Sequence, residues 1–327
     1  MKFGVVIPTW GDYWAQPNLI RNAVQAVEDL GFNGAWFGDH VVVPEYAIHL
    51  SPPQWYDALA CMGIAAGATD NIRLGTDVLV LPYRNPLVLS QFIASLDQLS
   101  GGRVTLGIGV GYISGEFQAL GAPPYERRGA VTDEYIEVMR LLWESTDGAS
   151  YAGEWNSFES MYSGPAPAQS PLPLWIGGNG RSAWRRAARY GDGWHPLFPL
   201  PEDYRQGRAA IEKYRSEGGR QGPMTFSMSC KRSRLVLQSG EHVPPLSARR
   251  DVPDEYKYSP APPKTADGRE RFVGSVGDVL QDVADYRDAG VDHILLRFWN
   301  GEPNPQFSEW LEQARRFSRY VLPEAEQ

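Results

Sequence analysis

Two adjacent side chains, Asp39 and His40, have the types and the spacing that acid–base chemistry needs. They directly follow the apolar segment 33–37, which is expected to form a buried strand. Because an imidazole titrates near neutral pH, a histidine at a strand end can exchange a proton with a bound molecule. A hydrogen-bonded histidine with a structural role fits this position equally well. His40 is therefore the candidate catalytic residue, with Asp39 beside it.

A carboxylate inside an apolar run is the second candidate. Residues 72–81 read IRLGTDVLVL, which is typical of a strand buried on both faces. Asp77 interrupts this run, and a buried carboxylate is costly unless it is paired or reaches a solvent-filled opening. We therefore expect Thr76, Asp77 and Val78 to line a binding site.

Glycines follow a further predicted strand, at 104–108. Gly107, Gly109 and Gly111 alternate there and precede Tyr112. Residues without a side chain allow a flat or anionic group to approach the backbone closely. This strand end is therefore a candidate wall of a cofactor site.

A second glycine cluster separates the predicted strand 172–176 from a helix at 182–190. Gly177, Gly178, Asn179 and Gly180 would leave backbone N–H groups free at the start of that helix, which is a suitable site for an anion. Glycine-rich turns are also common without any ligand. At a strand end, the cluster is predicted to hold a cofactor phosphate.

Aromatic side chains and further histidines occur near other predicted strand ends. The aromatic residues could wall a ring-shaped cofactor or fill the core. His195 is a weaker acid–base candidate than His40, and His293, at the start of a strand, is expected to be structural. The aromatic set is Trp10, Trp14, Trp36, Tyr112, Trp194 and Trp299.

Several classes of chemistry lack their motifs in this sequence. No H-x-x-x-H pattern is present, and Cys61 and Cys230 are too far apart in sequence to suggest a metal site, so reduced thiols are expected. No G-x-S-x-G nucleophile motif is present either. These observations favour an enzyme whose cofactor supplies the chemistry, without a metal.

Composition narrows the class of protein. Apolar residues make up 43% of the 327 positions, which is enough for a large core, and the net charge of −8 without a basic block argues against nucleic acid as a partner. No stretch approaches the roughly 18 apolar residues of a membrane span. The N-terminus has too short an apolar run for a signal peptide. We expect a cytoplasmic protein that binds a small-molecule substrate.

Predicted strands and helices alternate along the chain. The strands are expected at 2–8, 33–37, 72–81, 104–108, 172–176, 191–195, 225–237 and 291–298. The helices are expected at 18–30, 56–68, 86–99, 131–143, 182–190, 203–217, 275–289 and 307–320. The segments 148–171 and 239–268 lack a clear period and are interpreted as insertions, either over the site or without a role in it.

Eight strands alternating with eight helices predict one (β/α)8 barrel domain over 1–327, with catalytic groups at the C-terminal ends of the strands. A doubly wound open sheet is the competing architecture. No predicted strand is followed by a G-x-G-x-x-G pattern that opens a helix, which weakens that alternative.

Four collinear runs of this sequence resemble the luciferase-like monooxygenase superfamily. They are residues 31–40 (GFNGAWFGDH), 74–121, 127–143 and 173–196. The resemblance implies a (β/α)8 barrel with FMN or the deazaflavin coenzyme F-420 at its mouth. The Asp-His-Val-Val-x-Pro run at 39–44 is similar to the branch of deazaflavin-dependent oxidoreductases.

The resemblance also implies roles for particular residues. Asp39 and His40 match the pair near the reactive carbon, with Asp39 orienting the imidazole. Asp77 and Val78 match a non-prolyl cis peptide behind the cofactor ring, and Gly177 and Gly178 match the loop that receives the cofactor phosphate. The related sugar-phosphate dehydrogenases carry a Glu where this chain has Tyr112, so the resemblance does not imply glucose-6-phosphate oxidation.

Three functions remain open from the sequence. The first is hydride transfer between coenzyme F-420 and a small organic substrate, with His40 as acid or base. The second is an FMN-dependent monooxygenase that uses molecular oxygen and reduced flavin supplied by a separate reductase. The third is an inactive barrel that binds a flavin or a partner. A homodimer is expected because dimerisation is frequent in the superfamily that the chain resembles.

Overall fold

The computed structural model describes residues 1–11, 14, 16, 18–48, 53–238, 241, 243, 262–299 and 306–325. Its centre is a closed barrel of parallel strands, which confirms the predicted (β/α)8 fold. The strand order is β3-β2-β1-β13-β10-β9-β8-β5, and β3 pairs with β5 to close the circle. These strands are β1 (Lys2–Ile7), β2 (Gly34–Phe37), β3 (Arg73–Thr76), β5 (Val104–Gly109), β8 (Leu174–Gly177), β9 (Gly193–His195), β10 (Thr225–Ser229) and β13 (His293–Leu296).

The third position of the barrel is built from two short strands instead of one. β3 ends at Thr76, and β4 (Leu79–Val80) continues the pairing with β5 after a break. The break is at the peptide bond between Asp77 and Val78, which is cis, as the resemblance implied. The predicted continuous strand at 72–81 is therefore interrupted at the residues expected to face the binding site.

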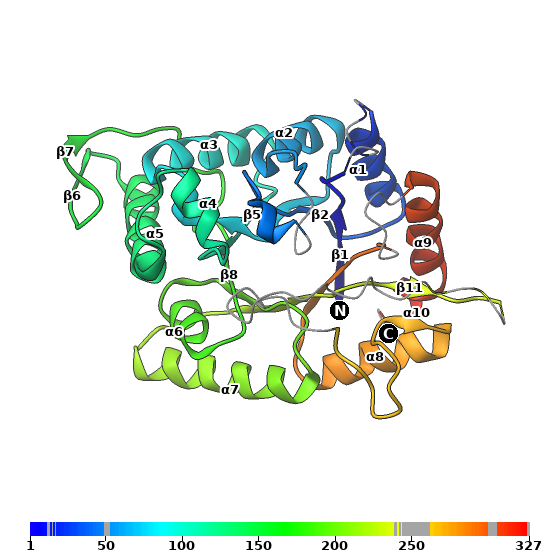
Figure 1. Cartoon of the computed structure of the whole chain (residues 1–327). Helices are drawn as coiled ribbons and strands as arrows, with labels where there is room; N and C mark the ends of the chain where they lie inside the picture. The colour runs from blue at the N-terminus through cyan, green and yellow to red at the C-terminus, as the bar shows by residue number, and fades with distance from the viewer. Residues whose placement is uncertain are drawn as a thin grey trace.

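Helices surround the barrel in chain order, from α1 through α3 and α5 to α9 (Figure 1). Several begin where a side chain accepts the free N–H groups of the first turn: Asp57 caps α2, Asn85 caps α3, and Ser275 forms a capping box with Asp278 at α8. The helices are α1 (Leu19–Asp29), α2 (Ala58–Ala68), α3 (Pro86–Leu99), α4 (Ser114–Ala119), α5 (Arg128–Glu144), α6 (Arg181–Tyr190), α7 (Pro201–Glu217), α8 (Val276–Asp288), α9 (Phe307–Tyr320) and α10 (Leu322–Ala325), with 3-10 turns at Glu45–Ala47, Leu81–Tyr83 and Tyr125–Arg127.

Two tryptophans fill much of the barrel interior. Trp36 on β2 stacks on Trp175 on β8, with ring centroids 4.7 Å apart. Glycines on neighbouring strands make room for them, because a Cβ at Gly75 would overlap the ring of Trp36 and a Cβ at Gly193 would overlap the ring of Trp175. Interiors packed this densely tolerate little added volume. Side chains therefore fill the barrel interior, and space for a ligand is left only at the ends of the strands.

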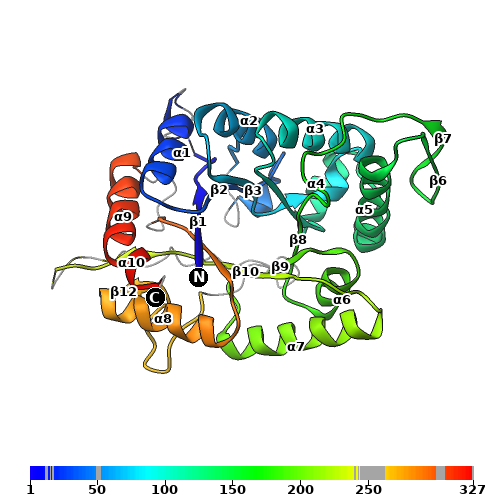
Figure 2. The ribbon, with the colours of Figure 1, turned by 180° about the vertical axis from the view of Figure 1, so that it is seen from behind.

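Two further predicted segments differ from the structure. The strand expected at 225–237 ends at Ser229, and β11 (Arg234–Leu235) pairs instead with β12 (Val273–Gly274) in a separate small sheet. The insertion at 148–171 contains an antiparallel hairpin of β6 (Ala149–Ala152) and β7 (Ser157–Met161), which projects beside α5 (Figures 1 and 2). Of the other insertion, the structure describes 262–268, 241 and 243, and the remainder lies outside the described residues.

Within the part of the chain that the structure describes, none of the helices has the length and hydropathy needed to cross a membrane.

Candidate active site

His40 lies directly beyond the C-terminal end of β2, and its side chain is 9% exposed. Its Nδ1 lies 3.0 Å from Oε2 of Glu116, and its Nε2 lies 3.2 Å from the hydroxyl oxygen of Tyr112. The indole of Trp55 lies against the imidazole, with ring centroids 5.0 Å apart. His40 is therefore held on two sides while part of it remains accessible.

Glu116 fixes the orientation of this imidazole from a fully buried position on α4. Its carboxylate also accepts the Val41 N–H at 2.9 Å and the Tyr83 hydroxyl at 3.0 Å. Burial, together with the neighbouring Glu116, raises the pKa of Tyr83 far above its usual value, so this phenol stays protonated and donates a hydrogen bond to the carboxylate. Since Glu116 only accepts, Nδ1 of His40 carries a hydrogen and Nε2 faces Tyr112.

Asp39 does not orient His40, contrary to what the resemblance implied. Its buried carboxylate accepts the Val80 N–H at 2.9 Å and two N–H groups of Arg84 at 2.7 and 2.8 Å. Arg84 also donates to Asp57, the cap of α2. Asp39 therefore anchors β4 and the turn that follows it, and the orienting role belongs to Glu116.

Glu116 was not among the candidates from the sequence, although a signal for it existed. The related sugar-phosphate dehydrogenases carry a Glu soon after the strand-end glycines, and this chain has Tyr112 at that position. Glu116 follows four residues later, within α4, so a carboxylate does lie shortly after the strand-end glycines.

Asp77 points into the barrel and not toward the mouth. Its Oδ1 lies 2.8 Å from Nε2 of His195, and its Oδ2 accepts from the Ser229 hydroxyl and from Arg297, at the end of β13. Burial alone would raise the pKa of Asp77, but the charge of Arg297 and the bonds from His195 and Ser229 outweigh it and hold that pKa below its usual value. Asp77 is thus a buried structural anion, not a side chain lining a cofactor site.

His195, the weaker acid–base candidate, is fully buried and belongs to the same network. Its Nδ1 lies 2.7 Å from the hydroxyl of Ser227 on β10. With both ring nitrogens bonded inside the barrel and no exposed surface, His195 has no path to a substrate.

Val78 is the member of the 76–78 segment that reaches the mouth. It is partly exposed, whereas Thr76 is buried and donates its hydroxyl to the Gly107 carbonyl at 2.6 Å. A Cβ at Gly109 would lie 2.7 Å from Val78, and one at Gly177 would lie 3.2 Å from it. The glycines of β5 therefore make room first for this segment of the chain itself. Gly111, with a φ of +79°, turns the backbone toward Tyr112.

The second glycine cluster has the geometry of an anion site. Gly178 has a φ of +116°, and α6 begins at Arg181 without a side-chain cap and without an acidic residue in its first turn. The N–H groups of a first turn have no partner within the helix, so they are suited to a phosphate. Arg181 is exposed beside them and adds positive charge.

The side chains of Asn179 and Trp194 form hydrogen bonds that hold this loop in place. They do not face the barrel mouth, in contrast to the expectation from the sequence. The Asn179 amide donates to the Leu197 carbonyl at 2.7 Å and accepts the Leu197 N–H at 3.0 Å. The indole N–H of Trp194 donates to the Gly178 carbonyl at 2.9 Å, and the Trp194 side chain is 1% exposed. Both side chains therefore fix the position of the glycines and leave the backbone to bind a ligand.

These features fit a flavin or a deazaflavin. Val78 offers an apolar surface, the start of α6 offers an anion site, and His40 offers a proton-exchanging group, all at the C-terminal ends of barrel strands. Exposed Val41 and Val42, at 46% and 41%, extend the apolar surface next to His40. The first two are the kinds of contact by which a ring system with a phosphate-bearing chain is bound, and the third is a group that a reaction on the ring can use.

Known proteins share this fold over almost the whole chain. The crystal structure of monooxygenase RslO1 from Streptomyces bottropensis superimposes with a TM-score of 0.80 at 23% identity and covers 99% of both chains. This likeness shows the fold.

Relatives also match in sequence. The phthiodiolone/phenolphthiodiolone dimycocerosates ketoreductase of Mycobacterium kansasii is 31% identical over 343 residues, covering 85% of this chain and 90% of that protein. The F420-dependent glucose-6-phosphate dehydrogenase of Amycolatopsis mediterranei is 27% identical over 329 residues, covering 94% of this chain and 93% of that protein. The sequence pattern of the luciferase-like monooxygenase family matches residues 1–233, and this chain belongs to that family.

Proposed function

We propose that this protein is an oxidoreductase that transfers a hydride between coenzyme F-420 and an alcohol or carbonyl substrate. The observation that carries the proposal is the His40 imidazole, which Glu116 holds in one tautomer at the barrel mouth. Two relatives support it by their names, one an F420-dependent dehydrogenase and the other a ketoreductase. Both names describe interconversion of an alcohol and a carbonyl group.

In such a reaction the side chains of the protein must transfer one proton to or from the substrate. Bound deazaflavin supplies two-electron hydride chemistry, and the protein must take up the hydroxyl proton of an alcohol or return one to a carbonyl oxygen. Nε2 of His40 is positioned to hold that proton, and the Tyr112 hydroxyl, 3.2 Å away, can pass it on from a substrate oxygen. The Glu116 carboxylate at Nδ1 stabilises the imidazolium that forms.

The surroundings of His40 indicate an apolar or ring-bearing substrate. The indoles of Trp10 and Trp55 lie 5.1 Å apart at the mouth, and Trp299 meets Trp10 edge to face at 6.5 Å. Such a wall excludes water and presents flat apolar surfaces, and a site like this binds ligands mainly by burying apolar area.

An FMN-dependent monooxygenase is the second candidate function. The family's name and that of the RslO1 fold relative favour it. In that case the protein would bind reduced FMN from a separate reductase and use molecular oxygen. An anion site at the start of α6 would suit either phosphate, so this feature does not separate the two cofactors.

Cofactor titration tests the proposal. We expect purified protein to bind coenzyme F-420 more tightly than FMN, measured by quenching of cofactor fluorescence, and to bleach the deazaflavin absorbance when secondary alcohols are added. Replacing His40 by Ala should leave binding intact and abolish bleaching. Binding of FMN alone, with oxygen uptake, would favour the monooxygenase. Binding of neither cofactor would favour the third hypothesis, an inactive barrel.

A further inference from the structure

The segment that directly follows His40 exposes several large apolar side chains. Val41 and Val42 are 46% and 41% exposed, and Ile48, which ends the 3-10 turn Glu45–Ala47, is 45% exposed. We refer to residues 41–48 as the rim segment. Single exposed apolar side chains are common on protein surfaces, whereas a group of them marks a binding surface. Because this group begins next to the candidate acid–base residue, its ligand is expected to reach His40 as well.

Contacts with α4 hold the rim segment at the barrel mouth. The Val41 N–H donates to Oε1 of Glu116 at 2.9 Å, and the Tyr46 hydroxyl accepts the Gly115 N–H at 2.9 Å. A Cβ at Gly115 would lie 2.7 Å from the side chain of Pro44, so the two segments pack closely. Since α4 follows β5 in the chain, the rim segment is fixed near the C-terminal ends of the strands.

The charge of this region narrows the kind of ligand. Positions 41 to 56 contain one glutamate and one histidine but no lysine or arginine, and the whole protein has a net charge of −8. An anionic substrate tail or an anionic lipid surface would therefore find no cation on the rim segment. An uncharged apolar chain can instead lose contact with water there without leaving a charge unpaired.

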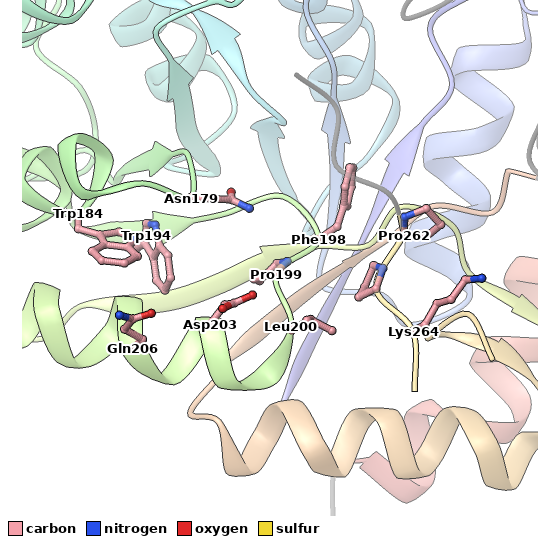
Figure 3. Close-up of a pocket in the computed structure, with 11 residues that line it drawn as sticks. Asn179, Trp184, Trp194, Phe198, Pro199, Leu200, Asp203, Gln206, Pro262 and Lys264 are labelled. Atoms are coloured by element: carbon pink, nitrogen blue, oxygen red, sulfur yellow. The ribbon is translucent and has the colours of Figure 1, made fainter. Parts of the chain in front are cut away.

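The cavity of 520 Å³ shown in Figure 3 is less suited to such a chain. Trp194 and Phe198 give it apolar walls, but Asp203 and Lys264 also line it. An uncharged chain placed against these two charged groups would displace water from them without replacing its hydrogen bonds. Asn179 lines the cavity too, which places it beside the proposed phosphate loop. The rim segment is therefore the better surface for an apolar chain.

We propose that the rim segment binds the apolar tail of the substrate, and we call this surface the tail site. The inference rests on the proposed function and specifies its substrate class: uncharged alcohols or ketones that carry a long alkyl chain. The reacting carbon would lie at Nε2 of His40, and the chain would leave the mouth across Val41 and Val42 toward Ile48.

The affinity of such a surface increases with the length of the bound chain. Full burial of one methylene group strengthens binding about fourfold. The side chains of the rim segment remain partly exposed, so each methylene there should contribute less, about twofold. Replacing Val42 and Ile48 by serine removes apolar surface from positions that are already in contact with water. The fold should therefore tolerate these changes.

The first experiment measures binding of 2-nonanone and 2-pentanone to the purified protein by the change in tryptophan fluorescence, because Trp10 and Trp55 lie beside His40. The wild type should bind the longer ketone about sixteenfold more tightly. A Val42→Ser, Ile48→Ser double variant should reduce this ratio to about fourfold or less. The ratio compares two ligands of the same protein, so a general loss of affinity cancels.

The second experiment makes the same comparison in the proposed reaction. It measures kcat/KM for bleaching of coenzyme F-420 by 2-nonanol and by 2-pentanol. We expect a ratio of about sixteenfold in the wild type and of about fourfold or less in the double variant.

Met161→Ser is the matched control. Met161 is 51% exposed, similar to Val42 and Ile48, but it lies on the β6–β7 hairpin that projects beside α5 (Figure 1). It should leave both ratios at the wild-type value.

The outcomes separate the tail site from the proposed function. Equal affinity of the wild type for the two ketones, or the same ratio in the wild type and the double variant, would overturn the tail site even if alcohols bleach the deazaflavin. Binding that depends on chain length and on the rim segment, without bleaching by any alcohol, would support the tail site and contradict the proposed function. Equal ketone affinities together with sedimentation of the wild type, but not of the double variant, on phosphatidylcholine vesicles would overturn the tail site in favour of a membrane contact.

Discussion

His40 and Glu116 lie 76 positions apart in the sequence, and their side chains meet at 3.0 Å. The contact forms because β2 and β5 end at the same edge of the barrel, so the short segments that follow them converge. One residue of the pair is buried and the other reaches the mouth, as expected for an orienting group and a reacting group.

Replacing Glu116 by Gln should lower kcat for the proposed alcohol oxidation by about tenfold to a hundredfold, because a neutral amide does not stabilise an imidazolium as a carboxylate does. Cofactor affinity, measured by fluorescence titration, should stay within about twofold. Glu134→Gln is the control: Glu134 is also buried, but it accepts backbone N–H groups of Glu154 to Asn156 beside the hairpin. A normal kcat in Glu116→Gln would contradict the orienting role.

Tyr112→Phe tests the proposed path of the proton. Without the hydroxyl that lies 3.2 Å from His40, kcat should fall about tenfold in steady-state assays while cofactor binding is retained. Tyr162→Phe, which changes a 79% exposed tyrosine, should have no effect. An unchanged or higher kcat in Tyr112→Phe would mean that the substrate reaches Nε2 of His40 directly.

His293 should make the stability of the fold sensitive to acid. Burial between the two interior tryptophans lowers its pKa from 6.5 to about 3, so the folded protein keeps the imidazole neutral. Below pH 6.5 the unfolded chain takes up a proton that the folded protein does not, so stability is lost as the pH falls toward 3.

The size of this effect follows from the linkage between protonation and folding. Between pH 7 and pH 5 the free energy of unfolding of the wild type should drop by about 2 kcal/mol more than that of a His293→Met variant. Urea titrations of both proteins at the two pH values measure the difference. Parallel losses in both proteins would contradict the assignment.

A larger residue next to Trp36 should destabilise the fold, because the space around its indole is already filled. Gly75→Ala would overlap the indole of Trp36, and we expect it to destabilise the fold by about 3 kcal/mol in thermal or urea unfolding. Gly63→Ala on α2 has open space at the new methyl group and should stabilise by about 0.5–1 kcal/mol, because alanine favours a helix over glycine. Equal effects of the two changes would contradict this account.

We propose that the protein is a homodimer that pairs through α2 and α3. These neighbouring helices expose large apolar side chains: Ile64 at 44%, Val88 at 68%, Phe92 at 41% and Leu99 at 86%. Exposed apolar groups gathered in this way mark contact surfaces. Sedimentation should give a dimer for the wild type and a monomer for a Val88→Lys, Phe92→Lys variant. A monomeric wild type would contradict the proposal.

The barrel could be predicted because its signals are local. The spacing of Leu89, Ile93 and Leu96 along α3 depends only on helix geometry, as does the capping box at Ser275. The break after Thr76 and the early end of β10 depend on pairing with other strands, which local periodicity does not report.

The site was predicted less completely because its contacts are distant in sequence. Asp77 was identified as unusual, but its partner Arg297 lies 220 positions away, and only the closed barrel brings them together. Asp39 and Glu116 both lie near His40, and the sequence alone favoured the neighbour in the chain over the neighbour in space.

The tryptophan pair inside the barrel makes substitutions at several positions depend on one another. Trp36 occupies the volume that side chains at 4 and 75 would need, and Trp175 occupies the volume needed at 193. A larger residue at 75 therefore requires a smaller one at 36 in the same protein, because each change alone leaves a clash or a cavity. Variation at these positions is expected to proceed by paired substitutions, and a library that changes one position at a time would not sample interiors in which both partners of a pair differ.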